Sequence, residues 1–280
     1  MSLNIEAEIN RVRRFYENDE KQNGFNLLLL GEYGSGKTPV LLTARKPIWI
    51  DSFDPKGTIG LKKWIAKGEV IADTEYEDDD PYSPSAFKKW KSNFKKRYAS
   101  DFFDGIGTYC IDSSTTFTAA AMNYKMEEAS RAGLTPHRNK DYNPAKIEVQ
   151  NYIRKCLNLK CDFIFTGHLK PVDKLLSIDK TTGIERRETR YRYSTIGQAA
   201  QFIPLLFSEI YVVLKRESSS GPKRDLLTDA SGEYIARSKL TSDGLLKAKE
   251  EPNIKSILKK VGMSYRDKPL FQNQTKGGEK

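Results

Sequence analysis

The chain of 280 residues has little cysteine, only two histidines and no long apolar run. Its three cysteines, Cys110, Cys156 and Cys161, are odd in number, and none stands in a C-x-x-C pair with two histidines nearby. Neither a disulfide framework nor a zinc site is therefore indicated, and we expect three buried thiols. No apolar stretch approaches the roughly 20 residues that span a bilayer. The first residues also lack the apolar block of a secretory signal, so the sequence favours a cytoplasmic protein without a membrane partner.

The composition is typical of a globular protein. Charged residues make up 30% of the chain and hydrophobic residues 38%, which is enough to form a core, and the length fits one main domain with arms. Lys and Arg outnumber Asp and Glu by 47 to 37, giving a net charge of +10. This excess favours polyanionic partners bound in a salt-sensitive way, although charge alone does not establish nucleic-acid binding.

Apolar runs alternate with helical patterns through the first two thirds of the chain. The runs predict strands at 25–30, 47–51, 105–112 and 161–168, and helical spacing predicts helices at 4–18, 86–99, 113–133 and 144–159. This order predicts an α/β fold in which helices cover both faces of a mostly parallel central sheet. We expect the first helix to pack on the domain as an arm, and the acidic loop at 73–85 to lie in solvent.

Two β-hairpins are expected toward the C-terminus. In the first, extended arms within 174–194 flank the turn "DKTTG"; the second joins strands at 208–216 and 232–240. In the helix at 86–99, an aromatic stripe is expected to face the core and the lysines to face solvent. The alternative for this helix is a nucleic-acid surface.

The stretch "GEYGSGKT", residues 31–38, fits the pattern G-x-x-x-x-G-K-[ST] of a phosphate-binding P-loop. A random match is expected in roughly one chain of this size in 100, and here an apolar strand precedes the loop and a helix follows it. Gly34 and Gly36 let the backbone wrap around phosphate oxygens, so that successive N–H groups meet negative charge. Lys37 would reach the β- and γ-phosphates, and Thr38 would give its hydroxyl to Mg²⁺.

Polar residues follow three of the predicted strands. Asp112 ends "TYCID" and would emerge at the carboxyl edge of the sheet, near a metal; its alternative role is to cap the helix that begins near Ser113. Asp51 and Asp54 follow "PIWI", and either could orient the attacking water or shape a turn. His168 follows "CDFIFTG", where a polar group can contact a γ-phosphate and pass the nucleotide state to the next segment.

With these residues in place, the chain resembles the RecA-like ATP-binding proteins of bacteriophages, a family that includes RecA-type single-strand annealing proteins. The resemblance is carried by six segments in order, namely "LLLLGEYGSGKT", "PIWIDSFDPKG", "TYCIDSSTTF", "CDFIFTGHLK", "IGQAAQFIPLLFSEIYVV" and "GEYIARSKL". It implies a RecA-like P-loop NTPase core at residues 24–262, with a helical arm at 1–23, a tail at 263–280 and C-terminal β-hairpins.

The resemblance also implies ATP and Mg²⁺ as cofactors. Phosphate contacts then fall on the loop that begins at Gly31, with metal coordination helped by Asp112 and a polar switch at His168; the phosphate-binding residues are Gly34, Ser35, Gly36, Lys37 and Thr38. In RecA the strand that matches "IWID" ends in an acidic dipeptide whose glutamate activates water, but here Ser52 and Phe53 follow Asp51. Asp54 is the nearest substitute, and slow hydrolysis is expected.

In RecA-like proteins the segment after the switch contacts single-stranded DNA, so this chain is expected to bind it there. Cations can follow the phosphates while tyrosines stack on bases; the alternative is a charged surface hairpin. The residues concerned are Lys170, Lys174, Lys180, Arg186, Arg187, Arg190 and Arg192, with Tyr191 and Tyr193 between them. The family also implies a homo-oligomer, as a filament or ring, in which Arg237 or Lys239 reaches a neighbour's phosphate.

The leading functional hypothesis is a phage-type ATPase, slow or DNA-stimulated, that acts in DNA recombination or single-strand annealing in a host cytoplasm, where phage replication or recombination proteins are further partners. One alternative is a P-loop ATPase that serves a replication or packaging machine through protein partners. Another is a nucleotide-binding module that does not hydrolyse ATP, which the missing glutamate motivates.

Overall fold

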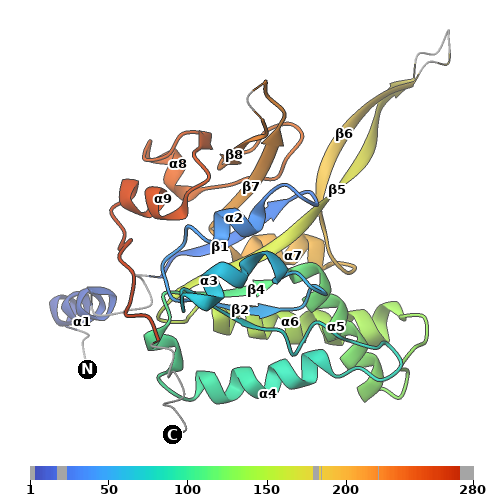
Figure 1. The fold of residues 1–280 in the computed structure, drawn as a ribbon, viewed down its shortest axis with the longest axis horizontal. Helices are drawn as coiled ribbons and strands as arrows, with labels where there is room; N and C mark the ends of the chain where they lie inside the picture. Colours follow the sequence, from blue (N-terminus) through green and yellow to red (C-terminus); the bar gives the residue numbers. More distant parts are fainter. Residues whose placement is uncertain (1–3, 18–23, 179–182, 184, 220, 272–280) are drawn as a thin grey trace, which may run out of the picture.

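A mostly parallel sheet forms the centre of the molecule (Figure 1). The computed structural model describes residues 4–17, 24–178, 183, 185–219 and 221–271. Within them the strand order is β3-β2-β4-β5-β1-β7-β8-β9, with β6 paired to the outer part of β5. The strands are β1 Asn26–Gly31, β2 Ile48–Ser52, β3 Val70–Asp73, β4 Thr108–Asp112, β5 Asp162–Ile178, β6 Glu185–Ser194, β7 Glu209–Arg216, β8 Lys223–Leu227 and β9 Lys249–Glu250. From β3 to β7 every neighbouring pair is parallel, whereas β6, β8 and β9 pair antiparallel.

Helices cover both faces of the sheet, and the four leucines of β1 show why its sequence is apolar throughout. Leu28 and Leu30 pack into the core beneath α4 Ala86–Tyr98, α5 Ser114–Glu128, α6 Asn143–Cys156 and α7 Ala199–Leu206. Leu27 and Leu29 pack into the opposite core, with α2 Lys37–Leu41, α3 Lys62–Ala66, α8 Lys239–Ser242 and α9 Ile254–Lys260. Because successive side chains point to opposite faces, a strand buried on both faces is apolar at every position.

The expected fold class is confirmed by this arrangement. The strands predicted at 25–30, 47–51, 105–112 and 161–168 correspond to β1, β2, β4 and the first part of β5, and the helices predicted from residue 86 onward correspond to α4, α5 and α6. The aromatic stripe of α4 faces the core, as predicted, through Phe87, Trp90 and Phe94. All three cysteines are free and buried, and among the described residues no helix is long and apolar enough to cross a membrane.

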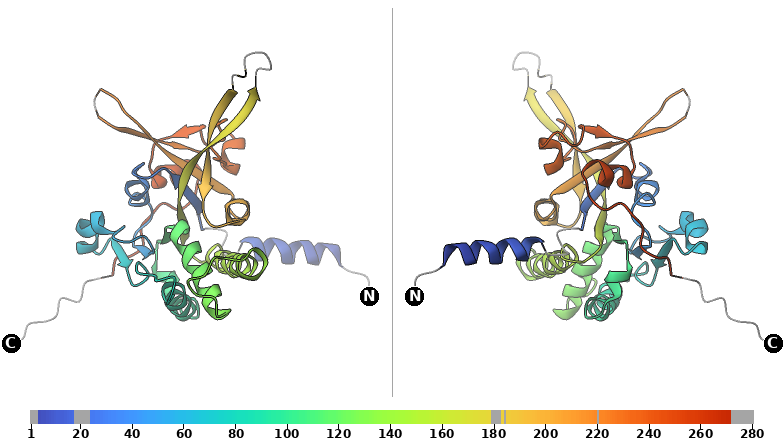
Figure 2. Two further views of the ribbon diagram at one scale, coloured as in Figure 1. Left: turned by 90° about the vertical axis from the view of Figure 1, so that its right-hand side faces the viewer. Right: turned by 90° about the vertical axis from the view of Figure 1, so that its left-hand side faces the viewer.

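The N-terminal helix departs from expectation. The helix α1, Ile5–Glu17, forms, but none of its residues is buried, and Ile5 and Phe15 are about 70% exposed (70% and 71%). Figures 1 and 2 show it standing away from the body of the protein. Its own periodicity and local pairs such as Arg11 with Glu8, 2.6 Å apart, account for the helix. The prediction that it packs on the domain was therefore wrong.

The second hairpin also differs from the prediction. Strand β7 pairs with β8, at 223–227, rather than with residues 232–240. The turn around Gly221, whose φ is +102°, reverses the chain directly, so β8 takes the place beside β7. Residues 232–238 instead form a loop, with one isolated bridge between Arg237 and Ile210, and α8 begins at Lys239. Strand β8 begins with the charged residues "KRD", so its sequence lacks the apolar run that predicts a strand.

The first hairpin is longer than predicted. Strand β5 runs without interruption from the core out to Ile178, and β6 returns along it, so the pair projects from the body (Figures 1 and 2). Its expected turn, including Lys180, lies outside the described residues. The acidic loop is only partly solvent-exposed, because Tyr76 is buried and stacks on Phe53 with ring centroids 5.3 Å apart.

Candidate nucleotide site

The P-loop lies between β1 and α2, and its glycines adopt conformations that side chains rarely allow. The φ angles of Gly34 and Gly36 are +71° and +102°. A Cβ on Gly31 would overlap the hydroxyl of Ser35, and a Cβ on Gly36 would overlap the side chain of Arg224. The Ser35 hydroxyl is buried and makes no hydrogen bond within the described part of the chain. At Gly34 no atom lies within 4 Å of where a Cβ would stand, so the loop is open to a ligand's oxygens at that turn.

Lys37 is buried at the base of this loop, with 8% of its surface exposed. Its Nζ donates to the carbonyl oxygens of Gly31 at 3.1 Å and Glu32 at 3.2 Å, and it lies 3.3 Å from Nδ1 of His168. Burial lowers the pKa of Lys37, while the nearby carboxylates of Asp112 and Asp54 oppose that shift. The ammonium is thus held by groups that can be exchanged for phosphate oxygens.

His168 connects Lys37 to Asp54. Its Nε2 lies 3.3 Å from Oδ2 of Asp54, on the opposite side of the ring from Lys37. An ammonium can only donate and a carboxylate can only accept, so Nδ1 accepts from Lys37 and Nε2 carries the proton. Through its two ring nitrogens the histidine links the P-loop with the end of β2.

Asp54 is the carboxylate of this region whose pKa is lowered. Burial alone would raise its pKa, but hydrogen bonds from His168, Thr116 and Ser113 outweigh burial and lower it. The two hydroxyls lie 2.5 Å (Thr116) and 2.8 Å (Ser113) from Oδ1. Asp54 is consequently ionised at neutral pH, although it is only a quarter exposed.

Asp112 lies at the end of β4, beside the loop. Its Oδ1 accepts a hydrogen bond from the hydroxyl of Thr166 on β5. Burial raises the pKa of Asp112, the hydrogen bond from Thr166 lowers it, and Asp54 and Lys37 act in opposite directions. The alternative role of Asp112, capping α5, is not what the structure shows: the N-cap residue of α5 is Ser113, the helix has no side-chain cap, and the Asp112 carboxylate accepts from Thr166.

The donor set fits Mg²⁺ bound together with phosphate. Thr38 is half-buried, and its hydroxyl has no hydrogen-bond partner within the described residues. Asp112 ends β4, which is separated from β1 by β5. Among those residues no group of three or more His, Cys, Asp or Glu side chains could hold a metal alone. Mg²⁺ in such sites is held by one or two carboxylates or hydroxyls, and phosphate oxygens and water complete its shell.

Asp51 lies elsewhere, and this separates the two acids that follow β2. Its carboxylate is fully buried and accepts from Trp49 at 2.8 Å, Trp90 at 2.9 Å and Arg97 at 2.9 Å, and from Tyr109 at 2.6 Å. All of these groups belong to the core beneath α4. Asp51 is therefore a structural anion, and of the two alternatives only Asp54 faces the P-loop.

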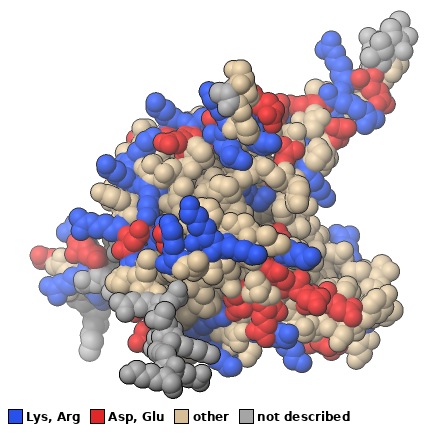
Figure 3. Space-filling model, viewed as in Figure 1, with Lys and Arg blue, Asp and Glu red and all other residues tan. Residues whose placement is uncertain are grey.

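The basic hairpin begins directly at His168. In the register of β5 and β6, Lys170 lies opposite Arg192, and Lys174 lies opposite Glu188. Since alternate residues share a face, these cations continue the face that His168 begins; Arg190 lies on the same face. Figure 3 shows blue side chains gathered toward the outer end of this hairpin.

The residues predicted to contact DNA differ in whether they already have an ion-pair or packing partner within the chain. Arg187 pairs with Glu185 at 2.7 Å and Arg190 with Glu188 at 2.8 Å. The cations that make no ion pair within the described residues are Lys170, Lys174, Arg186 and Arg192. Tyr193 is buried and donates to the Ser114 hydroxyl at 2.5 Å, so it is not available for stacking on a base.

Tyr191 is half-buried, and its ring is stacked on Tyr234, with centroids 4.6 Å and planes 6° apart. One face of Tyr191 is therefore covered. Arg237 donates to the carbonyl oxygens of Pro204, at 2.9 Å, and Phe207 of its own chain. The backbone N–H of Lys239 donates to Glu209 at 3.1 Å.

A contact that the sequence did not reveal comes from β8. Nε of Arg224 donates to the carbonyl oxygen of Ser35 at 3.1 Å, and its side chain lies against Gly36. Arg224 lies 188 residues beyond Gly36 in sequence and belongs to no motif, so only the pairing of β8 with β7 could have placed it here.

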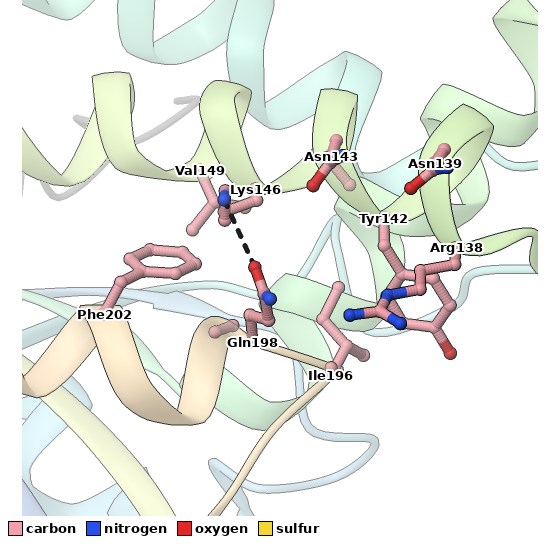
Figure 4. A pocket seen from close by; sticks show the side chains of 12 residues that line it. Arg138, Asn139, Tyr142, Asn143, Lys146, Val149, Ile196, Gln198 and Phe202 are labelled. Atoms are coloured by element: carbon pink, nitrogen blue, oxygen red, sulfur yellow. Dashed lines mark hydrogen bonds between the residues drawn. The ribbon is translucent and has the colours of Figure 1, made fainter.

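A cavity of about 540 Å³ lies away from the P-loop (Figure 4). It lies between the N-terminal end of α6 and the start of α7, and Val149 of α6 and Phe202 of α7 face each other across one end of it. Lys146 donates to Gln198 across it at 3.3 Å. No residue of 31–38 lines this cavity, so it is separate from the nucleotide site.

No protein-family model and no curated protein sequence matches the chain. Among solved structures, it is similar to a KaiC-like protein of Pyrococcus horikoshii OT3, with a TM-score of 0.40 and 13% identity over 77% of this chain and 84% of the other. It is also similar to the flagellar accessory protein FlaH of Methanocaldococcus jannaschii, with a TM-score of 0.40 and 10% identity over 81% of this chain and 83% of the other.

Proposed function

We propose that this chain is a RecA-like ATPase of phage type that binds ATP with Mg²⁺ and uses it to control binding of single-stranded DNA in recombination or strand annealing. One observation supports this most strongly. Lys37, His168 and Asp54 form a connected chain at the carboxyl edge of the sheet, and β5 runs on from His168 directly into the basic hairpin. Open α/β sheets bind ligands at this edge.

The loop residues hold the nucleotide. Backbone N–H groups of Gly34 to Thr38 receive the phosphates, and Lys37 exchanges its contacts to Gly31 and Glu32 for phosphate oxygens. Thr38 and Asp112 hold Mg²⁺, which supplies neutralisation of phosphate charge when bound. The Ser35 hydroxyl, buried without a partner, is a further donor toward the ligand.

Asp54 is the base in the proposed hydrolysis. It accepts a proton from the water whose oxygen forms a bond to the γ-phosphorus, while the bond from that phosphorus to the β–γ bridging oxygen breaks and ADP leaves. Its lowered pKa keeps it ionised but makes it a weak base. Slow turnover is therefore proposed, in line with the absence of a glutamate at the end of β2.

His168 passes the state of the site to the hairpin. Binding of a γ-phosphate would place an anion beside Nζ of Lys37, which lies 3.3 Å from Nδ1 of His168, so the contacts of His168 to Lys37 and Asp54 would change with the state of the site. Lys170 and Arg192 are one step further along the same face of the ribbon. Unpaired cations of this kind track a phosphate backbone without regard to sequence.

Assembly into filaments or rings belongs to the same proposal, with Arg237 or Lys239 placed toward the phosphate of a neighbouring protomer. Arg237 is held by carbonyl oxygens of its own chain, and those bonds are replaceable. Sedimentation with and without a non-hydrolysable ATP analogue tests this part. A monomer under both conditions at working concentrations would contradict it.

The experiment for the proposed function is ATP turnover at low salt with Mg²⁺, with and without single-stranded DNA, beside Lys37→Ala. Turnover that DNA stimulates and that Lys37→Ala abolishes supports the proposal. Turnover indifferent to DNA moves the assignment to an ATPase that acts on a replication or packaging machine through protein partners. Retention of intact ATP by the wild type after long incubation indicates a module that binds nucleotide without hydrolysis.

A further inference from the structure

The ribbon of β7 and β8 places two cations next to the P-loop. Val213 pairs with Leu226, and both lie in the core beside α2, which begins at the P-loop lysine. Two residues further along each strand, Lys215 pairs with Arg224. Because alternate residues of a strand share a face, Lys215 and Arg224 lie on the same face of the ribbon as Val213 and Leu226. That face packs on α2, and the cation pair extends it over the P-loop.

Arg224 touches the loop directly. It is half-buried, its Nε donates to the Ser35 carbonyl at 3.1 Å, and its guanidinium occupies the space that a side chain on Gly36 would need. A guanidinium has five N–H donors in a fixed fork. The two terminal amino groups of Arg224 make no hydrogen bond or ion pair within the described residues, so four of these donors stay available.

The surroundings do not neutralise this pair. Like charges directly opposite each other on two strands destabilise the pairing. The neighbouring acid, Asp225, pairs with Arg216 on the other face of the ribbon. Within the described part of the chain, Lys215 pairs with Glu217 alone, at 3.3 Å, and both side chains are exposed. An anion beside Arg224 would relieve the repulsion and use the open donors.

We infer that Arg224 binds the phosphate chain of the nucleotide held by the same chain's P-loop, with Lys215 adding to the positive field. The ligand class is a nucleoside polyphosphate, and this inference rests on the proposed nucleotide site. The ribbon of β7 and β8 then closes on the nucleotide opposite His168, so the phosphates are contacted from both neighbours of β1. Strand β1 lies between β5 and β7 in the sheet.

The test is calorimetric titration of the full chain with ADP and with a non-hydrolysable ATP analogue, in Mg²⁺ buffer at low and high salt. Arg224→Gln is expected to weaken binding about 10- to 100-fold at low salt, as loss of a charge-assisted hydrogen bond does. Arg224→Lys keeps the charge and is expected to recover part of that loss. Lys223→Gln is the matched control, since its exposed side chain is adjacent in sequence but lies on the opposite face of β8.

The salt dependence separates direct binding from mere support of the loop. If Arg224 contacts phosphate, the gap between wild type and Arg224→Gln narrows as salt rises; a gap that persists unchanged, or that Lys223→Gln shares, overturns the inference. Equal affinity of Arg224→Gln and wild type, while Lys37→Ala has lost binding, also overturns it and leaves the nucleotide site standing. If the wild type binds neither nucleotide, the proposed function fails and the inference falls with it.

Discussion

Replacement of Asp51 by Asn is expected to destabilise the protein without removing its catalytic groups. The carboxylate is fully buried, with two donors on each oxygen: Trp49 and Arg97 on Oδ1, Trp90 and Tyr109 on Oδ2. An asparagine has one acceptor oxygen and one amino group. The two donors that face the position of the amino group would therefore lose their acceptor. The guanidinium of Arg97, 14% exposed, would also lose its buried counter-charge, although its second ion pair with Asp73 remains.

The magnitude follows from these contacts. Breaking a buried ion pair from one side costs about 3–5 kcal/mol, which is a large share of the roughly 5–15 kcal/mol that stabilises a typical fold. With about 2.1 cal/mol/K of unfolding entropy per residue, a chain of 280 residues has about 0.6 kcal/mol/K. The melting temperature of Asp51→Asn is therefore expected to fall by about 5–8 °C.

The assay compares Asp51→Asn with Asp54→Asn by thermal melting and by ATP turnover at 20 °C. Asp51→Asn should melt earlier and, where it is folded, turn over ATP within about twofold of wild type, because its contacts lie beneath α4 and not at the P-loop. A wild-type melting temperature, or loss of turnover in folded protein, would show that we have assigned the two acids wrongly.

Three further outcomes are expected. Asp54→Asn should lower ATP turnover about 10²- to 10⁴-fold with nucleotide affinity retained. The pKa of Asp54 is lower in the folded than in the unfolded state, so the ionised carboxylate stabilises the fold above the unfolded-state pKa. This contribution is lost as the pH falls through the folded-state pKa. Acid titration below about pH 4 should therefore destabilise wild type more than Asp54→Asn. The double variant Lys170→Gln, Arg192→Gln should bind single-stranded DNA of every sequence more weakly and reduce the slope of log affinity against log salt concentration by about 1.4. Arg187→Gln should have a smaller effect, because Arg187 is already paired with Glu185. An unaltered slope in the double variant contradicts the assignment of the hairpin as the DNA-binding segment. Deletion of residues 1–17 should change the free energy of unfolding by less than about 0.5 kcal/mol, measured by urea titration, because nothing in α1 is buried.

The parts of the site that could be predicted from sequence are those fixed by local pattern. The P-loop, the acid at the end of β4 and the histidine at the sheet edge each follow an apolar run that can only be a buried strand, and parallel strands bring their carboxyl ends together. The position of Asp54 relative to Asp51 could not be predicted. It depends on where the chain turns after β2, and both acids follow the same strand.

The features that sequence reasoning missed depend on contacts between distant segments. Arg224 reaches the P-loop only because β8 pairs with β7, and its strand begins with charged residues that carry no apolar alternation. Tyr193 was expected among the stacking residues, but its register opposite Leu169 turns it inward to Ser114. Tyr191 is partnered by Tyr234, more than forty residues away in sequence. Such pairings are set by register, and a shift of one residue would invert them.

The continuity of β5 is the structural basis of the proposed coupling between nucleotide and DNA. In the parallel sheet, residues 162–165 pair with β4 and residues 163–168 pair with β1, whereas from Leu169 outward the strand pairs only with β6. A change at His168 therefore occurs where a rigid strand becomes a two-stranded ribbon. Thr115 reinforces this point, since its hydroxyl donates at 2.7 Å to the carbonyl of Ser194, the residue paired with His168. A reorientation of His168 would thus act on both strands of the ribbon at its base. A small rotation of the ribbon about its base displaces the cations near its far end most.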